Sequence, residues 1–162
     1  GSTDNCGQTP AVSATGGDTC EMIVFNTFPN GNAIPAGTNI TTQLAGFGIT
    51  QVQAIGGINQ AWTFDSGNPT GGDWDLGTPN QQYGGPGAGN GGASNTTALG
   101  NLLIVQENFN TPDDKANGGR LLFTFDGPKT VSDIVFVDIE ENGGTVKLTT
   151  PGGMVTLGMP SR

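Results

Sequence analysis

Apolar residues occur in short runs along the chain, and turn residues separate these runs. Several runs alternate apolar and polar positions, which is typical of half-buried strands, and no stretch has the spacing of a long amphipathic helix. The runs are bounded by clusters of Gly, Pro, Asn and Asp. The predicted strands are residues 21–25, 38–42, 48–55, 60–64, 101–107, 120–125, 132–139, 145–149 and 154–157.

Many short strands without a convincing helix predict an all-β fold. We expect a jelly-roll-like β-sandwich of about eight or nine antiparallel strands. The Asn-Gly-Gly turn at residues 142–144 is the strongest local hairpin signal. Trp62 and the phenylalanines that fall in strand patterns are the expected core residues.

The length of 162 residues suits one domain with a single core. We expect residues 1–20 to form a polar N-terminal arm and residues 21–162 to form one β-sandwich domain. Cys6 and Cys20 are the only cysteines. A disulfide between them would close a loop of about 15 residues and stabilise the protein by roughly 3 kcal/mol. Such a bridge predicts an oxidising compartment, so we expect a secreted, extracellular or cell-surface protein.

Charge and composition exclude several classes of function. The formal net charge of −9 would repel nucleic acid phosphates, and it fits either a domain loaded with cations or an acidic protein kept soluble by its charge. No apolar run approaches the length of a membrane span, so membrane insertion is not expected. The chain has no His, which excludes Ser–His and Cys–His nucleophile pairs and His-ligated zinc.

The loop at residues 64–76 is the most informative segment. It holds the carboxylates of Asp65, Asp73 and Asp75 and the amide of Asn68, among glycines that allow the backbone to fold back. Two unit charges about 4 Å apart repel by about 1 kcal/mol in water and by roughly 4 kcal/mol near a protein surface. A hard cation with oxygen ligands offsets this repulsion, and the sequence therefore predicts a Ca²⁺ site. The alternative is a solvated acidic turn.

Further acidic residues follow other strands. Glu107 ends an apolar strand, and Asp113 and Asp114 come after a short loop. Strand ends of a sandwich can converge at one end, so these three residues are candidates to complete the metal site, with a solvated turn as the alternative for the aspartate pair. Asp138 and Glu140 share one face of a predicted strand, and we interpret them as surface residues, with metal coordination as the alternative.

Paired carboxylates also occur in glycosidases, where one of the two acts as a general acid. A pair drawn from Glu107, Asp138 and Glu140 is a conceivable candidate. A bound cation would keep these carboxylates ionised, which is the wrong state for a general acid. We therefore do not expect an enzyme, and we assign no catalytic residue.

Trp74 and Tyr83 are aromatic residues in otherwise small, polar loops. An exposed ring beside carboxylates and amides is a common way to bind a sugar, because the ring packs on the C–H face of a pyranose. Both residues are therefore candidate contacts for a glycan. The alternative for Trp74 is a ring that folds back and covers the core.

The order of segments resembles secreted bacterial β-sandwich domains of surface-anchored proteins with a PEP-CTERM-like sorting signal. The resemblance covers residues 21–157, and residues 64–80 (FDSGNPTGGDWDLGTPN) are its most specific part. Asn26 stands where the resemblance leads us to expect an acidic residue. The other segments that carry it are residues 23–31 (IVFNTFPNG), 41–49 (TTQLAGFGI), 103–107 (LIVQE), 112–114 (PDD), 122–125 (LFTF) and 134–140 (IVFVDIE).

This resemblance implies a calcium-stabilised jelly-roll, similar to carbohydrate-binding modules, that serves in surface display, adhesion or glycan binding. Our first hypothesis is therefore an extracellular Ca²⁺-binding module for cell adhesion or carbohydrate binding, with a polysaccharide or cell-surface glycan as partner. The second hypothesis is a structural subunit of an extracellular matrix or filament. In that case the protein self-associates, and calcium only stabilises the domain.

Overall fold

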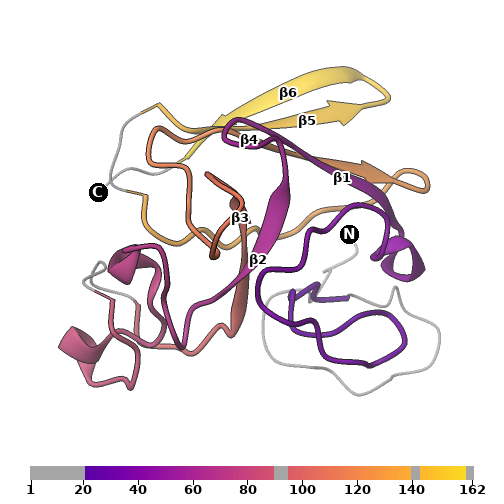
Figure 1. Cartoon of the computed structure of the whole chain (residues 1–162). Helices are drawn as coiled ribbons and strands as arrows, with labels where there is room; N and C mark the ends of the chain where they lie inside the picture. The colour runs from indigo at the N-terminus through magenta and orange to yellow at the C-terminus, as the bar shows by residue number, and fades with distance from the viewer. Residues whose placement is uncertain (1–20, 90–94, 140–142, 160–162) are drawn as a thin grey trace.

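The computed structural model describes residues 21–89, 95–139 and 143–159 of the chain. The described residues form six strands and three single-turn 3₁₀ helices, so the fold is all-β, as the sequence predicted (Figure 1). In chain order the elements are η1 (Ala45–Phe47), β1 (Ile49–Ile55), β2 (Ala61–Asp65), η2 (Trp74–Leu76), η3 (Gln81–Tyr83), β3 (Asn101–Val105), β4 (Arg120–Phe125), β5 (Thr145–Thr150) and β6 (Gly153–Gly158).

The strands form three antiparallel pairs, which are β1 with β4, β2 with β3, and β5 with β6. In the first pair Val52 lies opposite Phe123, with an irregularity in the register between Ile49 and Gln51. In the second pair Phe64 lies opposite Leu102. The third pair is a hairpin that forms the top layer of the molecule in Figure 1.

The segment at residues 37–41 joins the first two pairs. On one side it is hydrogen-bonded to β2, because Thr63 N–H donates to the Thr38 carbonyl (3.0 Å) and Ile40 N–H donates to the Ala61 carbonyl (2.8 Å). On the other side the Thr41 carbonyl accepts from Val52 N–H of β1 (2.7 Å). Residues 38–42 were predicted as a strand, and they contribute one isolated bridge. Their backbone bonds nevertheless place β1 and β2 around one core.

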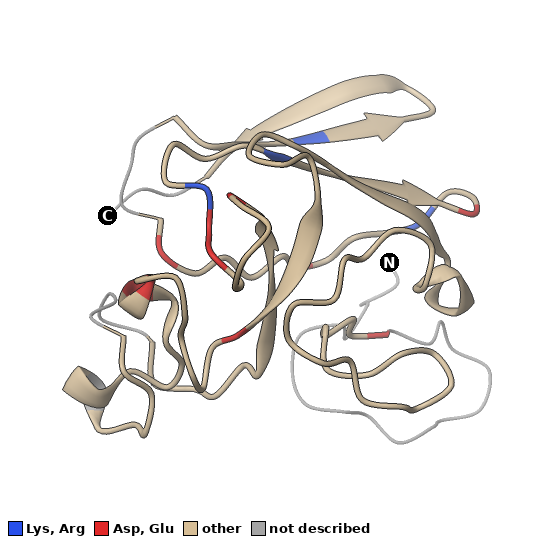
Figure 2. Cartoon of the chain, viewed as in Figure 1, with Lys and Arg blue, Asp and Glu red and all other residues tan. Residues whose placement is uncertain are grey.

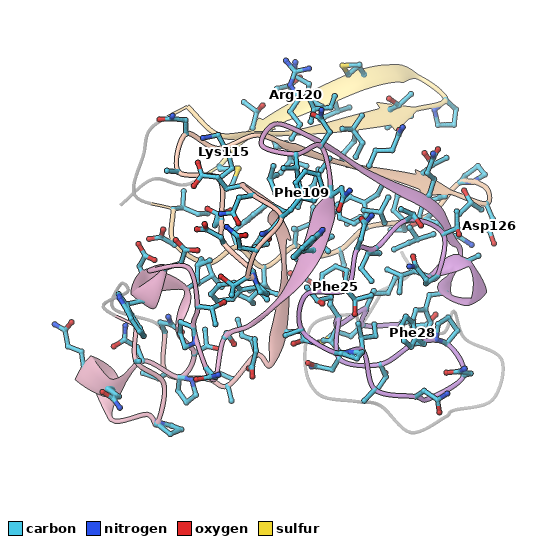
Figure 3. The ribbon with its side chains drawn as sticks, in the orientation of Figure 1. Phe25, Phe28, Phe109, Lys115, Arg120 and Asp126 are labelled. Carbon is cyan, nitrogen blue, oxygen red and sulfur yellow. The ribbon has the colours of Figure 1, made fainter. Side chains whose placement is uncertain are left out.

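Two clusters of buried side chains make the core. The larger contains Ile40, Leu44 and Val52, and Phe25 and Phe28 of the N-terminal segment pack against it (Figure 3). The smaller contains Phe64, Leu76 and Ile104, with Trp62 and Val137 packed against it. Apolar residues of β2 and β3 contribute to both clusters. These two strands therefore hold the loop that follows β2 against the body of the protein.

The predicted strand at residues 21–25 does not form. Side-chain amides hold this segment instead, because Asn101 Nδ2 donates to the carbonyls of Phe25 (2.9 Å) and Ile34 (2.7 Å). Asn26 Oδ1 in turn accepts from Asn101 N–H (2.7 Å). A tight loop follows, closed by the bridge between Thr27 and Ala33. Asn26, at the position where we expected an acidic residue, therefore fastens the segment to the start of β3.

The predicted strand at residues 132–139 does not form either. Asp138 has a φ of +59°, a left-handed conformation that interrupts an extended chain. The expected core role is wrong for three phenylalanines of this half, because Phe123, Phe125 and Phe136 are 38–40% exposed. Six strands in three pairs are fewer than the eight or nine predicted for the whole chain.

Two further expectations bear on the ends of the chain and on membranes. The predicted arm at residues 1–20, with Cys6 and Cys20, lies outside the described residues. Among the residues that the structure does describe, no helix is long and apolar enough to cross a membrane.

The large core cluster should dominate stability. Leu44 is 0% exposed, so we expect Leu44→Ala to lower the free energy of unfolding by about 2–5 kcal/mol through lost burial and an unfilled cavity. Leu122→Ala, at a position 39% exposed, is the matched control and should cost less than half as much. Urea unfolding of both variants measures the difference. Equal losses would contradict the assignment of the core.

Candidate acidic site between two loops

The loop after β2 begins with a turn that Asp65 closes on itself. Asp65 Oδ1 accepts from Gly67 N–H (2.9 Å), and the Asp65 carbonyl accepts from Asn68 N–H (3.1 Å). Farther along, the side chains of Ser66 and Thr78 are in hydrogen-bond contact, and both residues are buried. This polar contact fixes the two ends of the loop, so residues 67–77 project from a rigid base.

The projecting loop packs against the loop that follows β3. Thr70 Oγ1 donates to the Pro112 carbonyl (2.6 Å), and Asp114 N–H donates to Asp73 Oδ2 (2.7 Å). Gly71 permits this approach, because a Cβ at that position would lie 2.6 Å from Asp113 Oδ1. Two segments about forty residues apart in the sequence therefore meet through acidic residues.

The second loop has its own internal supports. The side chain of Gln106, which is 0% exposed, donates through Nε2 to the carbonyls of Asn108 (2.9 Å) and Thr111 (2.7 Å). Its Oε1 accepts from Asp113 N–H (3.1 Å). Asn108 Nδ2 also donates to the carboxylate of Asp113. One buried glutamine thus shapes the loop that carries the second set of acids.

Burial and mutual repulsion raise the pKa of two aspartates at this contact, Asp73 and Asp114. Burial, then repulsion by Asp73, raises the pKa of Asp114 from 3.8 to about 7, and Asp138 and Asp75 add to the increase. Hydrogen bonding from Lys115 N–H acts in the opposite direction. Burial also raises the pKa of Asp73, against the hydrogen bond from Asp114, with smaller contributions from neighbouring carboxylates.

Five of the seven predicted metal ligands gather at this contact, which we call the acidic site. Figure 2 shows acidic segments drawn together between η2 and the loop after β3. Its residues are Asp73, Asp75, Glu107, Asp113 and Asp114. Glu107 differs from the others, because Lys115 Nζ lies 2.7 Å from its Oε1 in an ion pair.

Two predicted ligands, Asp65 and Asn68, belong to the turn at the start of the loop and not to the acidic site. Asp138, interpreted from the sequence as a surface residue, is half-buried and acts on the pKa of Asp114. Tyr83 is the last residue of η3.

Trp74 stands between two acids of the site. It is the first residue of η2, with Asp73 before it and Asp75 after it, and it is 51% exposed. The ring therefore does not cover the core, which was the alternative we considered for it. The arrangement offers a flat apolar surface beside carboxylate oxygens.

The side chains do not form a ready-made metal site. Within the described ranges, no group of three or more acidic, His or Cys side chains is arranged to hold a metal ion. Calcium also takes backbone carbonyl and amide oxygens, and its six to eight ligands accept flexible geometry. The arrangement can therefore serve as a cation site only if the two loops contribute such oxygens or close slightly.

The raised pKa of Asp114 predicts how stability depends on pH. The native protein binds this proton more tightly than the unfolded chain does, so the free energy of unfolding should fall as pH rises from 3.8 to about 7. In chelator above this window, we expect Asp114→Asn to raise the melting temperature by about 2–4 °C. Asp133→Asn, at an exposed acid outside the site, should leave the melting temperature unchanged. If Asp114→Asn left the dependence of stability on pH unchanged, the raised pKa of Asp114 would be contradicted.

Comparisons with protein-family models, with curated proteins and with solved structures found no match to this chain. The resemblance to sorting-type surface domains therefore stays a prediction from the segments that suggested it. The functional argument depends on the geometry of the acidic site alone.

Proposed function

We propose that this protein is an extracellular, non-catalytic module whose acidic site binds Ca²⁺ and whose neighbouring Trp74 binds a polysaccharide or cell-surface glycan. The observation that carries the proposal is the contact of the two acidic loops. Asp114 N–H binds the Asp73 carboxylate at 2.7 Å, in surroundings that raise the pKa of Asp114 to about 7. Acids held together at such a cost in burial and charge repulsion are candidates for cation ligands.

The charge of the whole chain supports a cation as the ligand. The net charge of −9 favours any bound cation, and a divalent ion among Asp73, Asp113 and Asp114 would convert their mutual repulsion into attraction. Oxygen ligands without His or Cys select a hard cation, and Ca²⁺ is the one that tolerates irregular coordination. In this proposal Asp65 and Asn68 order the loop, and the direct ligands come from the acidic site.

The finer architecture is part of the same proposal. We place the three strand pairs in a jelly-roll-like sandwich, in which the hairpin β5–β6 belongs to the second layer. One cluster of acidic loops at an end of the layers would then be the binding end of the module. This placement is supported by the acidic site itself, to which loops after β2 and β3 both contribute.

Calcium should stabilise the protein measurably. At millimolar Ca²⁺ and a dissociation constant of about 10⁻⁴ M, mass action adds roughly 1–2 kcal/mol to the free energy of unfolding. Gly71→Ala should abolish this gain, because its Cβ would collide with Asp113. Gly72→Ala is the matched control, since Gly72 also has a positive φ but open space at its Cβ position.

Melting curves in Ca²⁺ and in chelator measure this difference for each variant. Both glycine variants place an alanine in a left-handed conformation, so both carry the same kind of backbone strain. Only Gly71→Ala also pushes the two loops apart, so the difference between the variants reports the contact of the loops. Identical melting curves of the wild type with Ca²⁺ and with chelator would overturn the calcium site.

Glycan binding should depend on the exposed ring of Trp74. We expect Trp74→Ala to reduce binding on a glycan array about tenfold, because aromatic contacts contribute about 0.5–1.5 kcal/mol beyond their buried area and about 1.4 kcal/mol is a tenfold change in affinity. Phe109→Ala is the control, since Phe109 is a 72% exposed aromatic residue in the loop after β3. Binding that survives Trp74→Ala, or that Phe109→Ala removes, would contradict the assigned surface. Absence of any glycan ligand would favour the structural-subunit hypothesis.

A further inference from the structure

The apolar side chains of the C-terminal half are unusually exposed. Val135 is 74% exposed, Ile134 49%, Leu157 50% and Val155 44%. Exposed apolar residues that lie together on a surface generally mark a site of contact with another molecule. These four belong to two neighbouring segments, namely β6 and the extended stretch before Asp138.

The hairpin β5–β6 has one apolar face and one mostly polar face, which also carries Met154. Val146, Leu148 and Leu157 line a groove of about 210 Å³ together with residues of the 131–136 segment. Val155 lies directly opposite Leu148, so it shares this face. Lys147 and Thr156 are opposite each other on the other face. The apolar face is only partly covered by the 131–136 segment.

Strand β6 also has an open edge. Within the described residues it pairs with β5 alone, and it lies at the outer rim of the molecule in Figure 1. All six of its residues are exposed. Open edges are normally protected from pairing by charged residues, proline or a bulge. The β6 sequence, GMVTLG, has no charge and no proline, and its register with β5 is regular.

We propose that two copies of this chain associate through β6 about a two-fold axis. Antiparallel pairing centred on Thr156 places Val155 opposite Leu157 of the second copy, and Leu157 opposite its Val155. The apolar residues of both copies then fall on the same face of one four-stranded sheet. The proposal depends on neither calcium nor a glycan.

The distribution of charge on the chain fits a second copy as the partner. Residues 145–158 carry a single charge, Lys147, although the whole chain has a net charge of −9. Most acids of the described residues lie elsewhere (Figure 2), although Asp133 lines the groove beside the apolar face. The two Lys147 side chains would be separated by three strand spacings, about 14 Å, which exceeds the Debye length at physiological salt.

Sedimentation and light scattering of the full chain test this proposal from micromolar to millimolar protein. We expect the mass to rise with concentration from 16.4 kDa to twice that value. Val155→Lys should keep the protein monomeric, since the two-fold axis would bring two new charges into an apolar contact. Phe109→Lys, at an exposed residue outside the surface, should associate like the wild type. The proposal is overturned if the wild type stays at 16.4 kDa at every concentration, or if Val155→Lys and Phe109→Lys lose association equally.

Hydrogen exchange of the wild type gives a test that needs no variant. Exchange of the β6 amides should slow as the protein concentration rises, and exchange of the β1 amides should not change. Protection that appears in other strands and not in β6 would overturn the proposed edge. If the association were lost in Ca²⁺-free buffer, the contact would lie at the acidic site, and the proposed pairing through β6 would be contradicted.

Discussion

The hydrogen bond from Asp114 N–H to the Asp73 carboxylate is the contact on which the candidate site depends. It joins a loop held by the buried Ser66 and Thr78 to a loop shaped by the buried Gln106. Neutral polar groups in the interior thus hold ionisable groups together near the surface. Burial at this contact, and then repulsion by Asp73, raises the pKa of Asp114, so the packing of the two loops also sets the electrostatic cost of the site.

The sequence predicted most of this site, because its acids follow strands that the hydrophobic pattern reveals. Glu107, Asp113 and Asp114 come after β3, and Asp73 and Asp75 come after β2, which is hydrogen-bonded to β3. For Asp138 the sequence favoured a surface position over a place in the site. Its backbone is left-handed and interrupts an otherwise strand-like pattern. The alternation of faces along a strand therefore does not predict where the Asp138 side chain lies.

The limits of fold prediction have a similar physical cause. Local alternation located β1 to β6 within a few residues, but a strand also needs a neighbour that offers backbone partners. Residues 21–25 found side-chain amides of Asn101 instead, and residues 132–139 lie beside the apolar face of the β5–β6 hairpin without a ladder. Apolar patterns reveal which segments can be buried, whereas the partner that buries them depends on the rest of the fold.

The molecule separates its charge from its exposed apolar surface. Acidic residues lie around η2 and the loop after β3, whereas β6 is an uncharged strand at the opposite side in Figure 1. Screening limits repulsion between distant charges to about 8–10 Å at physiological salt, so a net charge of −9 does not prevent contact through the uncharged edge. The proposed cation site and the proposed contact through β6 therefore lie on different parts of the molecule, and substitutions can change one without the other. The exposed apolar side chains on β6 are the surface that the proposed association would cover.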